Sequence, residues 1–371
     1  MAFFKTPQGL PYLLTPFIPL AIVADIAGAS AGLIFVIAAL GIIPTAALMG
    51  LATEELAAKS GPGIGGLLNV TFGNAPELII ALFALSEGLQ EVVKASIIGS
   101  ILGNILLVMG AAMFVGGLGR DRQFFNSTAA NAQASMLLLA ATAMAMPAIY
   151  QLVEGGGLPG VGIERVDFGS TVEHLSLIVS FVLAGTYGLG LLFSLKTHRD
   201  LFNPQAAEGE EEPDHDGFDW SIRRSIGMLA IAGIAVGVMS EILVGSISEA
   251  SESVGLSEFF IGVIVVAIVG NAAEHWVAVL VARKNQMDLA VNIAIGSTAQ
   301  VAPFVAPVLV VCSFFIGPGP MPLVFNGFEL GGVFLAVLIA QYVSHEGEST
   351  WFEGAQLLAV YLVLGITFFY A

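Results

Sequence analysis

Charged residues are scarce in this chain. They make up 11% of its 371 residues, whereas 56% are hydrophobic, and the mean hydropathy is +0.89. A soluble domain carries roughly 25% charged residues, so this composition excludes a soluble globular protein. Short alternating apolar segments, the pattern of a transmembrane β-barrel, are also absent. Apolar runs of roughly 17 to 25 residues, the length that a helix needs to cross a bilayer, recur instead. The sequence therefore predicts an all-α integral membrane protein.

Basic residues, cysteines and processing signals are equally sparse. Twelve lysines and arginines against a net charge of −17 exclude a nucleic-acid partner, which would require clustered basic residues. The single cysteine, Cys312, excludes an intramolecular disulfide. The start, "MAFFKTPQG", has no small-residue cleavage site, so we expect no removable signal peptide and favour a prokaryotic plasma membrane. No H-E-x-x-H pair is present, so we expect neither an enzyme nor a resident cofactor.

Eleven transmembrane helices are predicted from the apolar runs. They span residues 10–27, 31–56, 64–88, 93–117, 131–153, 173–195, 222–246, 256–282, 288–316, 325–344 and 353–371. With the N-terminus in the cytoplasm, ten of the twelve basic residues fall inside: Lys5, Lys59, Arg120, Arg122, Lys196, Arg199, Arg223, Arg224, Arg283 and Lys284. Only Lys94 and Arg165 fall outside. This positive-inside bias predicts a cytoplasmic N-terminus and an external C-terminus.

The chain also contains an internal repeat. Residues 64–100 and 261–297, which lie 197 positions apart, share ten identities in 37 positions aligned without a gap. A Gly-Asn-Ala-x-Glu motif fills residues 73–77 and again 270–274. Eleven helices therefore divide into one leading span and two units of five. Because five is odd, the units enter the membrane from opposite sides, an inverted-topology repeat typical of secondary transporters that bind substrate near the bilayer midplane.

These units give four predicted regions. They are a leading span (1–30), a first five-helix repeat (31–195), an acidic cytoplasmic linker (196–221) and a second five-helix repeat (222–371). The linker contains "NPQAAEGEEEPDHDGFDW", which carries seven carboxylates. Such a run is typical of a solvated tether, although a weak cation-attracting or regulatory role stays open.

Glu77 and Glu274 are the candidate functional residues. An ionised glutamate at the bilayer centre costs several kcal/mol, so such residues usually face a cavity and serve a function. These two occupy equivalent positions of the inverted repeat, so we expect them to converge. Side chains with oxygen ligands accompany them: Asn74 and Asn271 one helical turn earlier, and Ser100, Ser297, Thr298 and Gln300 in the following spans. An all-oxygen set suits calcium, magnesium or sodium rather than zinc or copper.

The proline in "TFGNAPELII" adds backbone ligands to this set. Pro76 has no N–H and clashes with the carbonyl four residues back, so we expect it to free the Phe72 carbonyl and loosen that of Gly73. Carbonyls of an interrupted helix at the midplane are cation ligands. The second unit has Ala273 at this position, so any break there would depend on Gly270.

Proton-linked residues are predicted among the same groups. Two carboxylates in one small, partly desolvated cavity repel each other, so the empty site of Glu77 and Glu274 is expected to hold at least one proton near neutral pH. His275 could titrate in the working range or serve only as a packing hydrogen bond. Glu241, within the seventh span, is a candidate for the ion path.

Several segments of the chain carry a family resemblance. "GIGGLLNVTFGNAPELI" (63–79) and "SEFFIGVIVVAIVGNAAEHWVAV" (257–279) resemble the two signature regions of the calcium/proton exchangers, within the calcium/cation antiporter superfamily. "SIIGSILGNILLV" and "AIGSTAQVAPF" are similar to the spans that complete each half-site. One departure is Pro76, where the family's first motif often has threonine.

The resemblance implies an eleven-span antiporter that exports cytosolic calcium in exchange for protons by alternating access. It implies cation binding at Glu77 and Glu274, with Asn74, Asn271, Ser100, Ser297 and Gln300 nearby, and His275 matches the proton-exchanging branch. The expected partners are the calcium ion, protons and the lipid bilayer. A broader cation/proton antiporter for sodium, potassium or other divalent cations is the alternative. A channel is disfavoured, because channels line an axial pore by oligomer symmetry.

Overall fold

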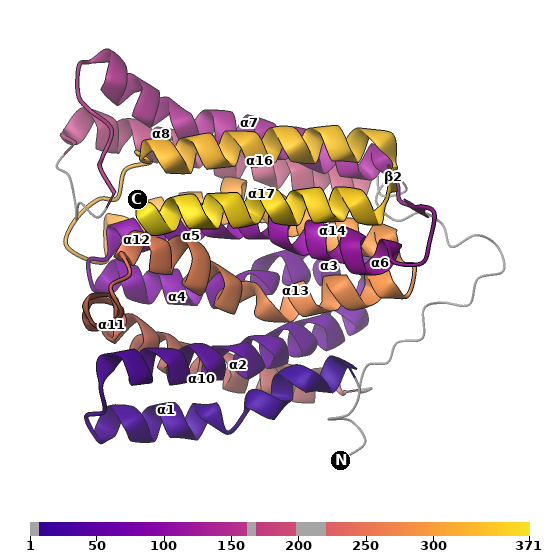
Figure 1. Ribbon diagram of the computed structural model, residues 1–371, viewed down its shortest axis with the longest axis horizontal. Coiled ribbons are helices and arrows are strands. Elements are labelled where there is room, and N and C mark those ends of the chain that lie inside the picture. Colours follow the sequence, from indigo (N-terminus) through magenta and orange to yellow (C-terminus); the bar gives the residue numbers. More distant parts are fainter. Residues whose placement is uncertain (1–6, 162–167, 198–219) are drawn as a thin grey trace.

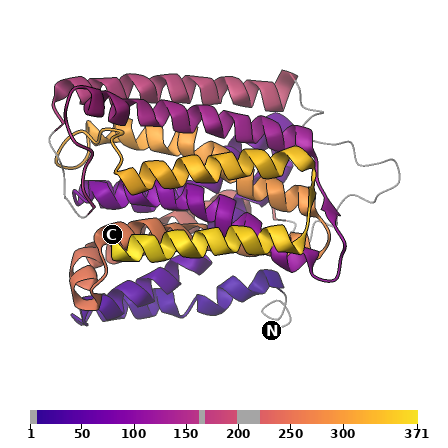
Figure 2. The ribbon, with the colours of Figure 1, turned by 45° about the horizontal axis from the view of Figure 1, so that its top comes forward.

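The computed structural model describes residues 7–161, 168–197 and 220–371. Within these ranges the chain is almost entirely helical, and its long helices lie side by side along one direction (Figures 1 and 2). The α-helices are α1 (Phe17–Ile26), α2 (Ala31–Lys59), α3 (Gly61–Gly73), α4 (Ala75–Ser86), α5 (Gln90–Leu102), α6 (Met109–Gly117), α7 (Ser127–Val153), α8 (Ser170–Leu192), α10 (Ile222–Gly245), α11 (Ile247–Val254), α12 (Glu258–Phe260), α13 (Ala267–Arg283), α14 (Met287–Gln300), α15 (Ala306–Ser313), α16 (Gly327–Glu346) and α17 (Trp351–Tyr370).

Several spans change helix type along their length. The 3₁₀ segment η2 (Pro7–Leu14) precedes α1, and four segments are π-helical: η3 (Gly103–Val108), η4 (Phe193–Thr197), η5 (Ile261–Val266) and η6 (Val301–Val305). The segments η3 and η6 occupy equivalent positions of the two repeats. Both spans therefore deviate from regular α-helix at equivalent positions. The π turns are rare in proteins overall, but those that occur are often found at functional sites.

The predicted eleven spans are confirmed for the described residues. Ten helices are long and apolar enough to cross a membrane, and the bent pair α3 and α4 forms the eleventh. This pair is bent by 42° at Asn74 (φ −97°, ψ 17°), two residues before Pro76. The second motif behaves differently, because α13 runs without a break through Gly270 and Asn271. The protein is a multi-pass integral membrane protein whose two halves are unequally distorted.

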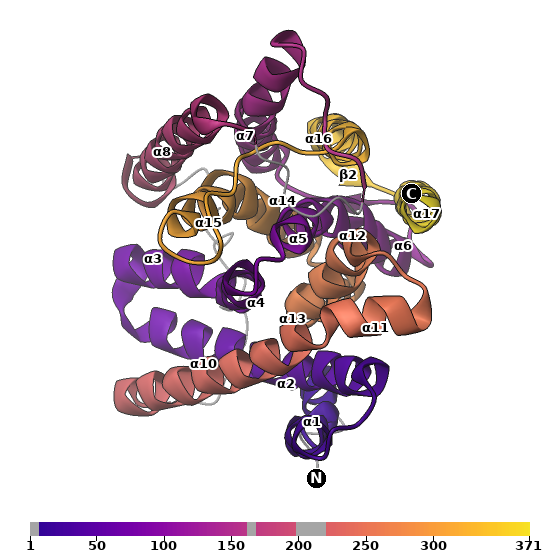
Figure 3. The same ribbon diagram turned by 90° about the vertical axis from the view of Figure 1, so that its left-hand side faces the viewer.

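Two spans form the centre of the molecule. The span Gln90–Gly117 is 83% buried and the span Met287–Ser313 is 72% buried in its most apolar window, against 17% for α17. Figure 3, viewed along the helices, shows α5 and α14 surrounded by the others. Gly99 permits this packing, because a Cβ there would overlap the Val263 carbonyl and lie 2.8 Å from the Ala267 Cβ. The central spans are those that carry Ser100 and Ser297.

Two contacts fasten segments at the end of the bundle that is predicted to face the cytoplasm. The short strands β1 (Gln123–Phe124) and β2 (Glu348–Ser349) pair antiparallel, with Gln123 opposite Ser349. At the start of α10, the Trp220 N–H donates to Glu55 at 3.0 Å, and the Lys59 ammonium donates to the Trp220 carbonyl. These two hydrogen bonds attach Trp220, just before α10, to the C-terminal end of α2.

Parts of the sequence prediction lie outside the described residues. These parts are the acidic run up to residue 219 and the basic residues Lys5, Arg165 and Arg199. The boundaries of the four predicted regions remain predictions. Of the two basic residues predicted outside, Lys94 is buried and paired with Glu91 at 2.5 Å.

Candidate cation-binding site

The two glutamates meet between α4 and α13, each beside the glycine of the other motif. A Cβ built on Gly270 would lie 3.2 Å from Cγ and 3.9 Å from Cδ of Glu77. In the reciprocal contact, a Cβ built on Gly73 would lie 3.9 Å from Oε1 of Glu274. Both side chains are half-buried. The structure therefore brings together the two carboxylates that lie 197 residues apart in the sequence.

Three enclosed oxygen atoms at these motifs lack a hydrogen-bond donor among the described residues. They are Oε2 of Glu77, Oε2 of Glu274 and Oδ1 of Asn271, all shielded from solvent. Buried acceptors are normally paired, and leaving one unpaired costs about 1–3 kcal/mol. A charged carboxylate costs more. A bound proton or a metal cation would complement such oxygens.

The motif asparagines pair crosswise with serines of the other repeat. Asn271 donates to the Ser100 hydroxyl at 3.1 Å, and the Ser297 hydroxyl donates to Asn74 at 3.2 Å. The two contacts are related by the same offset of 197 residues. Ser297 also lies beside the Glu274 carboxyl. The predicted Asn and Ser residues are thus neighbours of one another and of the glutamates.

Further amide groups extend this cluster. Asn74 donates to Oε1 of Gln300 at 2.7 Å, so Gln300 is a neighbour of Asn74. Asn104, 1% exposed, donates to the Ser297 hydroxyl at 3.4 Å. Asn104 was not among the predicted ligands, although an asparagine within an apolar span is a usable signal. Thr298 donates to the Ala294 carbonyl of its own helix, so its hydroxyl hydrogen is committed there.

The predicted backbone ligands lie at the break. Pro76 supplies no N–H to the Phe72 carbonyl, as expected, but that carbonyl accepts a hydrogen bond from the Asn74 N–H at the end of α3. It is therefore not left without a partner, and only its second lone pair remains for a cation. Gly73 is the last residue of α3, at the same break.

The other predicted residues lie around the cluster. His275 follows Glu274 on α13, and its enclosed Nε2 has no hydrogen-bond partner among the described residues. Glu241 is exposed near the end of α10, and no described contact joins it to the cluster. Glu54 of α2, which was not predicted as a ligand, is exposed and close enough to Glu274 for electrostatic repulsion. Glu54 lies near the C-terminal end of α2, the end predicted to be cytoplasmic.

Carboxylates and imidazoles alone do not make a metal site here. In the described part of the chain, no group of three or more His, Cys, Asp or Glu side chains is arranged to hold a metal ion. A hard cation at this position would need the amide and hydroxyl oxygens of Asn, Ser and Gln beside the two carboxylates. Calcium accepts such mixed oxygen sets, so the donor types fit a transported calcium ion.

Comparisons with known proteins agree with this architecture. The sodium/calcium exchanger protein family matches residues 30–196 and 224–370. A Ca(2+)/H(+) antiporter of Aphanothece halophytica is 47% identical over 91% of this chain and 90% of the relative. The Ca(2+)/H(+) antiporter ChaA of Bacillus subtilis is 45% identical over 96% of this chain and 97% of the relative.

Solved structures show the same fold. The structure of native YfkE is 40% identical and covers 97% of this chain and 100% of its own, with a TM-score of 0.80. The H+/Ca2+ exchanger CAX, only 13% identical, shares the fold with a TM-score of 0.70 over 99% of this chain. The chain belongs to the sodium/calcium exchanger family, in its calcium/proton exchanger branch.

Proposed function

We propose that this protein is an antiporter that moves calcium out of the cytoplasm in exchange for protons, with Glu77 and Glu274 as the shared carriers. The observation that carries this proposal is the set of enclosed carboxylate and amide oxygens without donors. The names of the antiporter relatives support the same activity. The cargo is calcium and protons; no resident cofactor and no catalytic chemistry are part of the proposal. We place the protein in a prokaryotic plasma membrane.

The exchange follows from charge balance at the two carboxylates. Two ionised glutamates in one enclosed site repel each other and are poorly solvated, so the empty site is stable only when protons neutralise it. A calcium ion supplies the same two positive charges and also fills the coordination of the free oxygens. Calcium and protons therefore exclude each other, and the site is occupied by one or the other.

Alternating access would turn this exclusion into transport. The hydrogen bonds Asn74–Ser297 and Asn271–Ser100 join the two repeats at equivalent positions, so the site lies between the repeats. Movement of one repeat against the other would expose this site to either side of the membrane in turn. A site loaded with calcium or with protons can cross without an uncompensated charge, whereas an empty ionised site cannot. That difference couples the two fluxes.

A broader cation specificity is the second candidate. It is favoured by relatives such as the vacuolar cation/proton exchanger 1a of Oryza sativa, which is 39% identical over 97% of this chain and 79% of the relative. Sodium and potassium also bind oxygen ligands, so the donor set does not choose between these cations. Glu77 and Glu274 would be the carriers in either case.

Flux into sealed vesicles tests the proposal. Purified protein is reconstituted with an acidic lumen, and calcium uptake is measured with sodium or potassium as competitor. Uptake that depends on the pH gradient and resists the monovalent ions is expected. Uptake driven equally by sodium or potassium would favour the broader antiporter, and uptake that needs no counter-ion would contradict exchange.

A further inference from the structure

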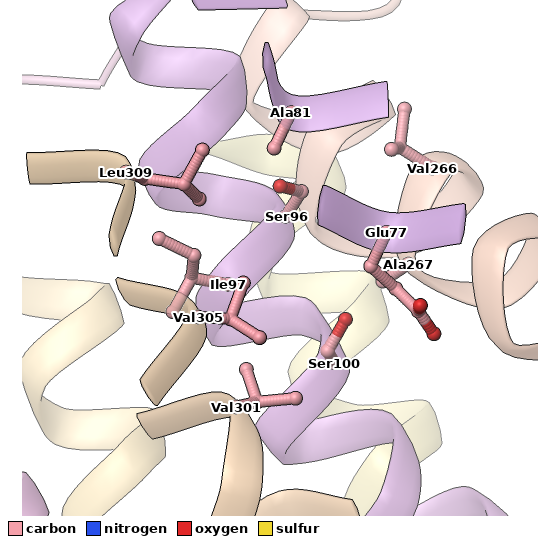
Figure 4. Close-up of a pocket in the computed structure, with 10 residues that line it drawn as sticks. All are labelled: Glu77, Ala81, Ser96, Ile97, Ser100, Val266, Ala267, Val301, Val305 and Leu309. Atoms are coloured by element: carbon pink, nitrogen blue, oxygen red, sulfur yellow. The ribbon is translucent and has the colours of Figure 1, made fainter. Parts of the chain in front are cut away.

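A pocket borders Glu77. It is lined by Glu77, Ala81, Ser96, Ile97, Ser100, Val266, Ala267, Val301, Val305 and Leu309. Figure 4 shows Leu309 and Ala81 at one end of the pocket and Val301 and Ser100 at the other. In the predicted orientation, α4 and the η6–α15 segment run outward, so Ala81, Val305 and Leu309 lie on the external side of Glu77. In that orientation, the pocket therefore lies on the external side of Glu77.

The side of this pocket formed by η6 and α15 is apolar along its length. Val301, Val305 and Leu309 recur every four residues on the same helical face, and the two valines are in the π-helical η6. Val266, the last residue of the π-helical η5, faces the same space. The hydroxyls in the pocket, Ser96 and Ser100, are both on α5.

The internal repeat allows a direct comparison with the cytoplasmic side. The position equivalent to Val266 is Asn69, and the position equivalent to Val301 is Asn104. Asn69 is exposed, and Asn104 donates to Ser297 of the site. Val305 and Leu309 correspond to Val108 and Ala112, which are apolar and buried as well. Among these four positions, the two repeats therefore differ in polarity at the two nearest the site.

We propose that this pocket is the external exit path of the cation and that Val301, Val305 and Leu309 form an apolar gate, closed in this conformation. A narrow apolar passage expels water, and a hydrated cation does not enter it. A closed external gate is what an exchanger needs while its site is open to the cytoplasm. This inference rests on the proposed exchange, and it assigns the outward step to named residues.

The first test makes the gate polar. In reconstituted vesicles, calcium flux and proton counterflux are measured together, with radioactive calcium and a lumenal pH dye. Val305→Thr, which adds a hydroxyl at nearly constant size, and Val305→Asn should lower the number of protons moved per calcium, by twofold or more for the asparagine. The control is Val310→Thr, because Val310 is buried on α15 but is not a pocket residue. It should keep the wild-type ratio.

The second test measures access directly. Cys312 is the single native cysteine, so a Cys312→Ala protein that carries Val305→Cys offers one thiol. A membrane-impermeant thiol reagent added outside should label it during turnover, and should not label it when Glu274→Gln arrests exchange. Labelling of the arrested protein, or none during turnover, would overturn the gate. Normal coupling in both Val305 variants would do so as well. Lack of exchange in the wild type would overturn both the gate and the proposed function, whereas the other results concern the gate alone.

Discussion

The side chain of Glu77 lies against Gly270, the glycine of the motif that carries the other glutamate. A Cβ at Gly270 would approach Cγ of Glu77 to 3.2 Å, closer than ordinary van der Waals contact, whereas a Cβ at Gly73 would lie 3.9 Å from Glu274. The repeat makes the two glycines equivalent in sequence, but the packing makes them unequal. The space available to each carboxylate is thus set by the opposite repeat.

This inequality predicts different effects of one added methyl group. Gly270→Ala should displace the Glu77 carboxylate and weaken calcium binding by about fivefold, or about 1 kcal/mol. Gly73→Ala is the matched control and should bind calcium within about twofold of the wild type. Calorimetric titration of the detergent-solubilised proteins measures both. Equal losses in the two variants would contradict the packing asymmetry.

Loss of either carboxylate should abolish exchange. Glu77→Gln and Glu274→Gln keep the shape of the side chain but remove a charge that calcium requires, and an amide costs less to bury than a carboxylate. We expect calcium/proton exchange at the background of protein-free vesicles, with normal yield and a normal elution profile. Glu252→Gln, at an exposed position on α11, is the control and should exchange normally. Ordinary exchange in either site variant would rule out the assignment.

Apparent calcium affinity should fall as the pH falls. Protons that occupy the calcium-free site must leave before calcium enters. A lower pH therefore stabilises the protonated, calcium-free form and opposes calcium binding. Between pH about 8 and about 6, the affinity should weaken by roughly tenfold per pH unit for each proton displaced. Titrations at constant ionic strength measure this slope, and Glu252→Gln should reproduce it. A flat profile would exclude direct competition at the two glutamates.

Trp220 should matter for stability rather than for exchange. The residue is 4% exposed, and the Arg224 guanidinium lies over its ring, 4.8 Å from the ring centroid. Its backbone is hydrogen-bonded to Glu55 and Lys59. Trp220→Ala should remove roughly 3 kcal/mol of packing and lower the melting temperature in detergent by several degrees, about 2–4 °C per kcal/mol in large domains. Trp220→Phe, which keeps an aromatic face for Arg224, should lose less than half of this. Identical melting temperatures for the two variants would show that the ring does not hold the junction.

The sequence by itself determined the spans and the identity of the two motifs. A membrane span is identified from the hydropathy of about 20 consecutive residues. Each span could therefore be predicted from its own stretch of sequence, including the pair broken before Pro76. The offset of 197 residues related Glu77 to Glu274 and Ser100 to Ser297 before any contact was known. An inverted repeat constrains which residues are equivalent, and equivalent residues on its axis converge.

Only the tertiary structure decided which side chains touch across the repeats. Asn74 pairs with Ser297 rather than with its own repeat's Ser100, Asn104 joins the cluster, and Glu241 stays outside it. The Phe72 carbonyl, predicted to be free, found a donor in the Asn74 N–H. Such contacts depend on the rotation and depth of helices about 200 residues apart, and these are set by packing at glycines such as Gly99 and Gly270. Packing depends on the fit between two helix surfaces, so these contacts cannot be predicted from the sequence of either helix alone.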